Sequence, residues 1–255
     1  MFGFNRHDIR LLINLFKMNV RDRYLGSSLG SVWAVTNPLL MLCLYTYVFG
    51  FVFKIRLPGA DTTLAYVVWL ISGLGPWNAS TESIMGASSA VVSASGMVKN
   101  MAFKTELLPV AGALVGIINL TVSLVFILVL LVFSGIGITW NIFLLPLVVV
   151  LQFAWVIAIG TWLSVITVFV RDVMQILPTL LTALLFMTPI FYSFEQMPEI
   201  IQKISVFNPF YQISEAYRAI LIGHHHPDVI GLFYVVIISM IVYIYGLAAF
   251  RRDKG

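Results

Sequence analysis

Residues 107–133 read LLPVAGALVGIINLTVSLVFILVLLVF, an unbroken run of 27 residues with no charged side chain. An α-helix rises about 1.5 Å per residue and the hydrocarbon core of a bilayer is about 30 Å thick, so about 20 apolar residues cross it as a helix. The length and composition of this run therefore predict a helix that spans a membrane. If this helix spans a membrane, the segments on either side of it must lie in or next to the bilayer.

The whole chain has the composition of a membrane protein. Of its 255 residues, 60% are hydrophobic and only 10% are charged, and the mean hydropathy is +0.98. A soluble domain keeps about a quarter of its residues charged to cover its surface, so lipid must be the solvent for most of this one. The first 30 residues lack a short apolar core followed by small residues, so no cleavable signal peptide is expected. Cys43 is the only cysteine, which excludes a disulfide within the chain.

Further runs are long and apolar enough to cross a bilayer. The predicted spans are 32–53, 64–86, 107–133, 142–170, 175–194 and 229–250. Segment 199–222 is also apolar, but Asn208-Pro209 breaks it and it carries charges, so we expect two short re-entrant helices at one membrane face. The predicted fold is all-α, a polytopic membrane protein with six transmembrane helices. We divide it into an interface segment, 1–30, and a single six-helix transmembrane domain, 31–255.

The basic residues predict the orientation of the spans, because loops rich in Lys and Arg face the cytoplasm. With the N-terminus inside, eleven basic residues fall in cytoplasmic segments and four in outer segments. The cytoplasmic ones are Arg6, Arg10, Lys17, Arg21, Arg23, Lys99, Lys104, Arg171, Arg251, Arg252 and Lys254, and the outer ones are Lys54, Arg56, Lys203 and Arg218. Both termini are therefore expected in the cytoplasm.

The N-terminal segment has the pattern of an amphipathic interface helix. Its polar positions recur every three or four residues and share one helical face, while apolar positions share an adjacent face. The polar face consists of Arg6, Arg10, Asn14, Lys17 and Arg21, and the apolar face of Ile9, Leu12, Ile13, Phe16 and Val20. Two roles remain open for the cations: they orient the chain in the membrane, or they also dock a partner.

The sequence contains few groups able to carry chemistry. It has no phosphate-binding loop and no paired metal-ligand spacing, so no cofactor is expected in this chain. His224, His225 and His226 precede Pro227, and we interpret them as a loop turn rather than a metal site. Glu82 is the one acidic residue predicted inside the hydrocarbon, where such a residue is a functional candidate by default. We favour the alternative, a carboxylate that reaches the inner interface or pairs with a neighbour.

Aromatic side chains are concentrated in the spans. Aromatic rings suit the apolar faces of sugars, so as a group they hint at a carbohydrate path, although core packing is the favoured role for any single one of them. The candidates are Tyr45, Tyr47, Trp69, Trp77, Trp155 and Trp162.

Four segments, read in order, carry a resemblance to a known family. They are 20–40 (VRDRYLGSSLGSVWAVTNPLL), 98–109 (VKNMAFKTELLP), 169–173 with 188–192 (FVRDV and TPIFY), and 208–210 with 215–218 (NPF and EAYR). Together they resemble the membrane subunit of type-2 ABC exporters, the branch that moves cell-surface polysaccharides. The resemblance extends over nearly the whole chain, from about residue 4 to residue 250.

The resemblance implies a set of partners. Two copies of the chain form a homodimer that lines a channel in the bacterial inner membrane, and two separate ATPase subunits bind ATP and Mg. The substrate it implies is a lipid-linked polysaccharide, O antigen first, with capsule or teichoic acid as alternatives. Membrane lipids are the remaining partners, and no nucleic acid is expected.

The resemblance also assigns roles to residues. A coupling helix over 95–106 seats in the ATPase, and the next cytoplasmic loop faces the same partner. The coupling candidates are Ser95, Val98, Lys99, Asn100, Met101, Phe103, Lys104, Arg171 and Asp172. The re-entrant break at Asn208 and Pro209 caps the outer side. Candidates for holding the substrate phosphate at the inner interface are Arg6, Arg10, Lys17, Arg21 and Arg23, because the Arg fork matches phosphate.

Two other classes of protein fit the same sequence. One is an exporter of a small lipid or drug with the same architecture. The other is a membrane-embedded enzyme, a transferase or lipid phosphatase, whose polar groups would converge at one interface. Its candidate groups are His224, His225, His226, Asp228, Glu195 and Glu199.

Overall fold

The structure is a computed structural model that describes residues 6–53, 63–100, 104–223 and 226–252. All regular secondary structure in these ranges is helical. The order of elements is α1 (Arg6–Arg23), η1 (Gly30–Val32), α2 (Trp33–Tyr45), η2 (Thr46–Val52), α3 (Thr63–Ser93), α4 (Ser95–Asn100), α5 (Leu107–Leu114), α6 (Gly116–Ser134), η3 (Trp140–Leu144), α7 (Leu145–Phe169), α8 (Val173–Met187), η4 (Phe194–Gln196), α9 (Glu199–Ser205), α10 (Pro209–Arg218), η5 (Ala219–Gly223) and α11 (Val229–Arg252). The all-α prediction is confirmed for the described residues.

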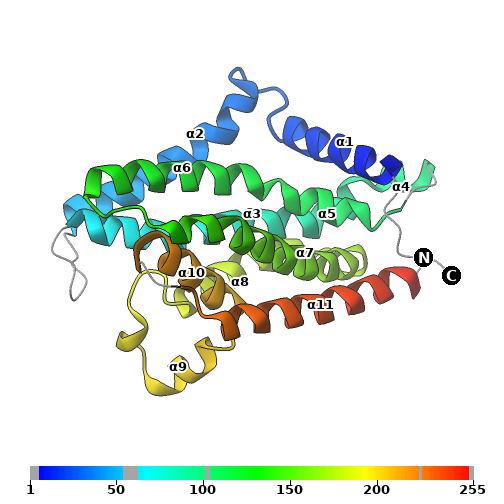
Figure 1. The fold of residues 1–255 in the computed structure, drawn as a ribbon. Helices are drawn as coiled ribbons and strands as arrows, with labels where there is room; N and C mark the ends of the chain where they lie inside the picture. The colour runs from blue at the N-terminus through cyan, green and yellow to red at the C-terminus, as the bar shows by residue number, and fades with distance from the viewer. Residues whose placement is uncertain (1–5, 54–62, 101–103, 224–225, 253–255) are drawn as a thin grey trace.

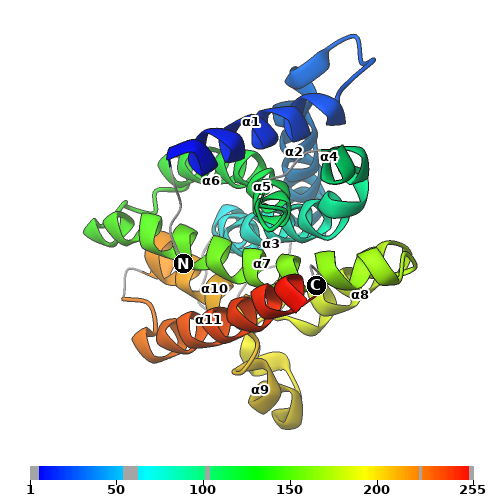
Figure 2. The same ribbon diagram turned by 90° about the vertical axis from the view of Figure 1, so that its right-hand side faces the viewer.

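Helix α3 is the centre of the bundle. It is 31 residues long and most of it is buried, with α5, α6, α7 and α10 packed around it. Figure 2 shows α1 crossing the bundle on one side, over α5, and α11 lying on the opposite side. The main core is built on α3: Ile71 and Leu74 pack with Leu120 from α6 and Val156 from α7.

Small residues let the helices at the centre come close together. A Cβ built on Gly86 of α3 would lie 2.6 Å from the carbonyl oxygen of Gly112 of α5, and a Cβ on Gly112 would clash with Gly86 in return. Two backbones can approach this closely only where neither residue carries a side chain, which is the usual reason for small residues between membrane helices. The α3–α5 contact is therefore fixed by this glycine pair.

Four helical stretches are long and apolar enough to cross a membrane: Gly30–Val52, Leu107–Ser134, Trp140–Phe169 and Val229–Phe250. They correspond to four of the six predicted spans, and the chain is a membrane protein on this ground. The predicted span 64–86 lies within α3, which continues to Ser93. Of the added residues, Ala87 and Ser88 are buried, and Ala90 and Val91 pack against the cluster around Leu15. The count of six spans stays a prediction.

The prediction was wrong about the end of the fifth helix. Helix α8 ends at Met187, not near residue 194, and is a shorter apolar helix of 15 residues. The next residue, Thr188, has extended backbone angles (φ −93°, ψ 133°). Pro189 follows, and a residue before proline disfavours helical angles, so proline sets this end.

The segment after α8 turns back as two short helices, α9 and α10 (Figure 1). The predicted break at Asn208-Pro209 is confirmed, because the Asn208 side chain caps α10 by accepting a hydrogen bond of 3.0 Å from the Phe210 backbone N–H. Pro209 occupies the first helical position, where its missing N–H costs nothing. Helix α10 is buried and contacts α3, α7 and α11.

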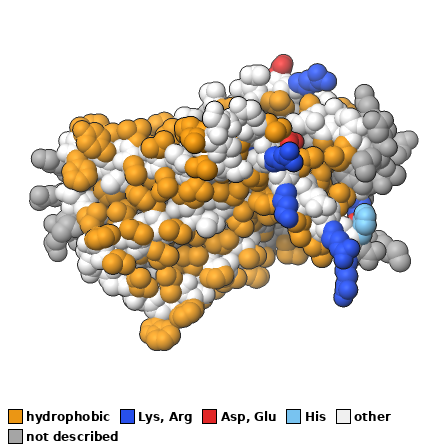
Figure 3. Space-filling view, turned by 90° about the horizontal axis from the view of Figure 1, so that it is seen from above, with side chains coloured by type: hydrophobic (Ala, Val, Ile, Leu, Met, Phe, Trp, Pro, Cys, Tyr) orange, Lys and Arg blue, Asp and Glu red, His pale blue; other side chains and the backbone are white. Residues whose placement is uncertain are grey.

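Apolar and basic side chains separate on the surface. In Figure 3, hydrophobic side chains cover most of the face seen from above, while the Lys and Arg side chains gather toward the end where α1 lies. The start of α1, the helix α4 and the end of α11 share that end of the molecule (Figure 1). This distribution matches a membrane protein with one basic interfacial end.

Candidate functional site

Helix α1 presents three faces. Asp8 and Leu15 are buried, and Leu15 packs with Leu107, Leu108 and Ala111 in a small cluster separate from the main core. The apolar face predicted from the sequence divides between packing and exposure: Leu12 packs against this cluster, whereas Ile9 and Ile13 are about half exposed. The predicted cations Arg6, Arg10, Lys17 and Arg21 are exposed. An exposed apolar face beside exposed cations is the arrangement of a helix lying in a membrane interface.

Two ion pairs fasten the ends of α1 to the bundle. At its start, Asp8 accepts a hydrogen bond of 2.6 Å from Lys104 Nζ, which lies just before α5. At its end, Arg23 pairs with Glu82 in α3. The side chain of Glu82 is 16% exposed and that of Arg23 is 48% exposed. The prediction that Glu82 pairs with a neighbour is confirmed.

A pocket of about 950 Å³ lies beside the Arg23–Glu82 pair. Its walls come from the second half of α1, the second half of α3, α4 and the beginnings of α5 and α6. The charged residues in its lining are Asp22, Arg23 and Glu82, whose formal charges sum to −1. The remaining polar lining is uncharged and includes Asn78, Thr81 and Asn119.

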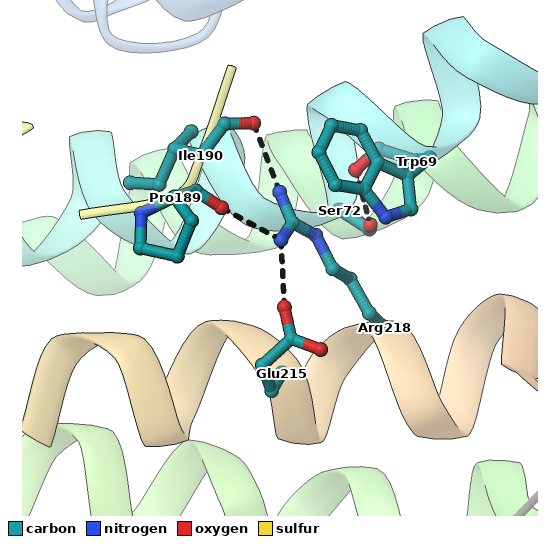
Figure 4. A network of polar contacts seen from close by, with 6 residues as sticks. All are labelled: Trp69, Ser72, Pro189, Ile190, Glu215 and Arg218. Atoms are coloured by element: carbon teal, nitrogen blue, oxygen red, sulfur yellow. Dashed lines mark hydrogen bonds and ion pairs between the residues drawn. The ribbon is translucent and has the colours of Figure 1, made fainter. Parts of the chain in front are cut away.

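A second polar network lies on the opposite side of α3, around Arg218 of α10 (Figure 4). Its guanidinium group donates hydrogen bonds of 2.9 Å to the carbonyl oxygens of both Pro189 and Ile190, and it pairs with Glu215 at 2.7 Å. It also lies over the Trp69 ring, 3.7 Å from the ring centroid. The sequence predicts Arg218 as an outer cation and places it in the family segment 215–218. Glu215, three residues earlier on the same helix face, is the local signal for the ion pair.

The predicted aromatic candidates do not form one surface. Trp77 and Trp155 are buried and pack edge-on against Phe210, with ring centroids 5.1 and 5.9 Å away. Trp162 is partly buried, and its indole N–H donates a hydrogen bond of 2.8 Å to the Val242 carbonyl oxygen. Tyr45 is half-buried, and Tyr47 alone of the six is exposed, at 59%. In this conformation Trp77 and Trp155 have the packing role that the sequence left open.

Residues 10–222, most of the chain, match the ABC-2 type transporter family of membrane proteins. The chain belongs to this family. It is 29% identical over 234 residues to the O-antigen export system permease protein RfbA of Myxococcus xanthus, covering 91% of this chain and 88% of that one. It is 24% identical over 247 residues to the protein of the same name from Klebsiella pneumoniae, covering 96% and 92%. It is 23% identical over 252 residues to the polysialic acid transport protein KpsM of Escherichia coli, covering 94% and 92%.

The structure of this ABC-2 subunit places several predicted partner-facing residues at one end. Helix α4 is shorter than the predicted coupling helix 95–106: it ends at Asn100, and the chain is in a turn by Thr105. Ser95 and Lys104 are exposed, and so are Arg171 and Asp172 in the turn between α7 and α8. The side chains of Val98, Lys99 and Asn100, and all of Met101 and Phe103, lie outside the described residues.

The groups proposed for an enzyme do not assemble in the described part of this ABC-2 subunit. Within it there is no group of three His, Cys, Asp or Glu side chains placed to hold a metal ion. Glu195, Glu199, His226 and Asp228 are each exposed. His224 and His225 lie outside the described residues.

Proposed function

We propose that this chain is the transmembrane subunit of an ATP-driven exporter that moves a lipid-linked polysaccharide, O antigen in the first place, across the bacterial inner membrane. The observation that carries the proposal is the full-length similarity to O-antigen export permeases, which covers about nine-tenths of this chain. A polysialic acid transport protein is similar over the same length. The substrate class is thus the one shared by these relatives.

The proposed topology has six spans with both termini in the cytoplasm. The four apolar stretches are four of these spans, and helices α3 and α8 are the other two. Helix α3 is less apolar because it is enclosed by other helices rather than by lipid, and α8 is short because Pro189 ends it. The exposed cations of α1 then lie at the inner interface, where a membrane surface adds about 1 kcal/mol per basic residue.

Two copies of the chain complete the channel in this proposal. Gln175, Thr179 and Thr182 share one face of α8, and all three are exposed in the single chain. Polar side chains on a membrane helix normally find partners on another helix or line an aqueous path. Phe49 at the end of the first span stacks on Phe191 just after α8, with ring centroids 5.6 Å apart, so the two spans share this side of the chain. We place the second copy of the chain against the side formed by the first span and α8.

The energy comes from a separate ATPase in this proposal. The chain has no phosphate-binding loop, and α4 and the α7–α8 turn present exposed polar residues at one end for a partner. ATP and Mg bind in that partner. The phosphate of the lipid-linked substrate meets the inner interface at the cationic face of α1, where Arg6, Arg10, Lys17 and Arg21 are exposed.

Deletion of the gene in its host tests the proposal. Surface polysaccharide should disappear and lipid-linked polymer should accumulate inside the cell. The intact chain should restore display together with its ATPase, and should not restore it with an ATPase that lacks its phosphate-loop lysine. Unchanged surface polysaccharide after deletion would contradict the proposal, and a defect limited to drug tolerance would favour a small-molecule exporter of the same family.

A further inference from the structure

The pocket beside Arg23 and Glu82 has the volume of a ligand site. Ligand pockets in proteins usually measure about 300–1,000 Å³, and this one measures about 950 Å³. It opens beneath the second half of α1, the helix whose cationic face is exposed on its other side. A molecule held by that cationic face is therefore only one helix width away from the pocket.

The lining of the pocket suits hydroxyl groups better than phosphate. Asn78 and Asn119 offer amide donors and acceptors, and Thr81 offers a hydroxyl. The charged side chains of the lining sum to −1, because Asp22 and Glu82 outnumber Arg23. A phosphate inside would therefore meet net repulsion, whereas a neutral sugar would meet amides, a hydroxyl and a carboxylate, all of which bond to sugar hydroxyls.

One polar atom of the lining lacks a partner. The hydroxyl oxygen of Thr81 is buried and makes no hydrogen bond within the described residues. Buried polar groups in folded proteins are nearly always paired, and an unpaired one calls for a ligand, a water or a strained function. Asn78, three residues earlier on α3, lines the same pocket.

The pocket has a fixed floor and a separately attached wall. The floor is the α3–α5 contact, where the backbones of Gly86 and Gly112 touch. The α1 wall is attached by the small cluster around Leu15 and by the ion pairs at its two ends. The Arg23 side chain is 48% exposed, so water can solvate its guanidinium group when the pair with Glu82 opens.

We propose that this pocket binds the sugar next to the phosphate of the lipid-linked substrate, with Asn78, Thr81 and Asn119 bonding its hydroxyls and the Arg23–Glu82 pair closing over it. This assignment rests on the proposed function. It separates two tasks within one helix: the outer cationic face of α1 meets the phosphate, and the inner side covers the sugar. The substrate class for the pocket is a neutral hexose or N-acetylhexosamine.

The test compares two probes on the complex of this chain with its ATPase in lipid nanodiscs. One probe is a polyprenyl diphosphate, and the other is the same lipid carrying a single N-acetylhexosamine. The intact complex should bind the sugar-bearing probe about tenfold more tightly, the effect of two neutral hydrogen bonds. Thr81→Val combined with Asn78→Leu should bring the two affinities within about twofold while the sugar-free probe binds as before.

A matched control separates the pocket from general damage. Thr121 lies on the exposed side of α6, and its hydroxyl bonds the Ile117 carbonyl oxygen of its own helix, so Thr121→Val should keep the tenfold preference. Equal binding of both probes to the intact complex, or a preference that survives the Thr81 and Asn78 changes, would overturn the pocket assignment and leave the proposed function standing. Failure of the chain to assemble with an ATPase would instead overturn the proposed function.

Discussion

Arg218 of α10 stacks on Trp69 of α3, with its guanidinium carbon 3.7 Å from the centre of the ring. The same guanidinium donates to the carbonyl oxygens of Pro189 and Ile190, which belong to the turn after α8. One buried side chain therefore joins three segments that are far apart in the sequence. This junction fixes α10 against the central helix α3.

Replacement of Arg218 by Lys should destabilise the chain by roughly 3 kcal/mol, because lysine cannot bond two carbonyl oxygens and a carboxylate in one plane. Chemical unfolding in detergent, followed by tryptophan fluorescence, measures this difference. Lys203→Gln is the matched control: Lys203 is an exposed cation in the neighbouring helix α9, and its loss should change stability by less than about 0.5 kcal/mol. Equal effects of the two changes would contradict the role given to Arg218.

Tyr217 and Gln152 should prove energetically coupled. The Tyr217 hydroxyl donates a hydrogen bond of 2.6 Å to Gln152 Oε1, and Gln152 Nε2 donates one of 2.8 Å to the Pro76 carbonyl oxygen. Tyr217→Phe and Gln152→Leu each leave a buried group unpaired, at about 1–3 kcal/mol. The double variant should lose less than the sum, by about 1 kcal/mol, in a double-mutant cycle of unfolding free energies. Strict additivity would show that the bond does not form.

The glycine contact between α3 and α5 predicts a steric effect. Gly86→Ala puts a methyl group against the backbone of Gly112, and backbone must then shift, so we expect a loss of about 1–3 kcal/mol. Gly137→Ala serves as the control, since a Cβ there meets nothing within 4 Å. Thermal unfolding of both purified variants gives the comparison. A Gly86→Ala chain as stable as the control would place the two helices further apart than the structure does.

Locking α1 should stop export. In a chain carrying Cys43→Ser, which removes the only cysteine, Arg23→Cys and Glu82→Cys introduce two thiols where the ion pair lies. A short reducible bifunctional reagent should cross-link the two thiols. The cross-link should abolish surface display of the polysaccharide, because α1 can no longer move away from the pocket. Reduction of the cross-link should restore display.

The control for that experiment pairs Glu82→Cys with Arg21→Cys. Arg21 is exposed on the other side of α1 and lines a separate surface pocket, so this pair should not cross-link. Normal surface display from the cross-linked chain with Arg23→Cys and Glu82→Cys would show that export does not require α1 to move.

Local features of the sequence, such as apolar runs and prolines, predicted most of the helices. They did not predict the contacts between residues far apart in the sequence. The apolar run 107–133 forms the helices α5 and α6, and α6 ends one residue beyond the predicted end, at Ser134. Helix α3 ends at Ser93, beyond the predicted span end at residue 86. Contacts with other helices hold the added turns, since Ala87 and Ser88 are buried and Ala90 and Val91 pack against the cluster around Leu15. The end of α8 was misplaced although Pro189 was visible in the sequence.

The candidate site was predicted in part. The helical spacing of Arg6, Arg10, Lys17 and Arg21 correctly identified an exposed cationic face. The pairing of Arg23 with Glu82 joins residues 59 positions apart, and that of Lys104 with Asp8 joins residues 96 apart. No local pattern encodes such pairs, so the packing face of α1 and the pocket beneath it became visible only in the folded chain.

Native mass spectrometry tests whether this chain is the membrane subunit of an exporter driven by a separate ATPase. The chain, of 28.5 kDa, is expressed with the proteins encoded beside it and purified in mild detergent. We expect a complex of two copies with two ATP-hydrolysing subunits. A lone chain that copurifies with no ATPase under conditions that preserve membrane complexes would contradict it.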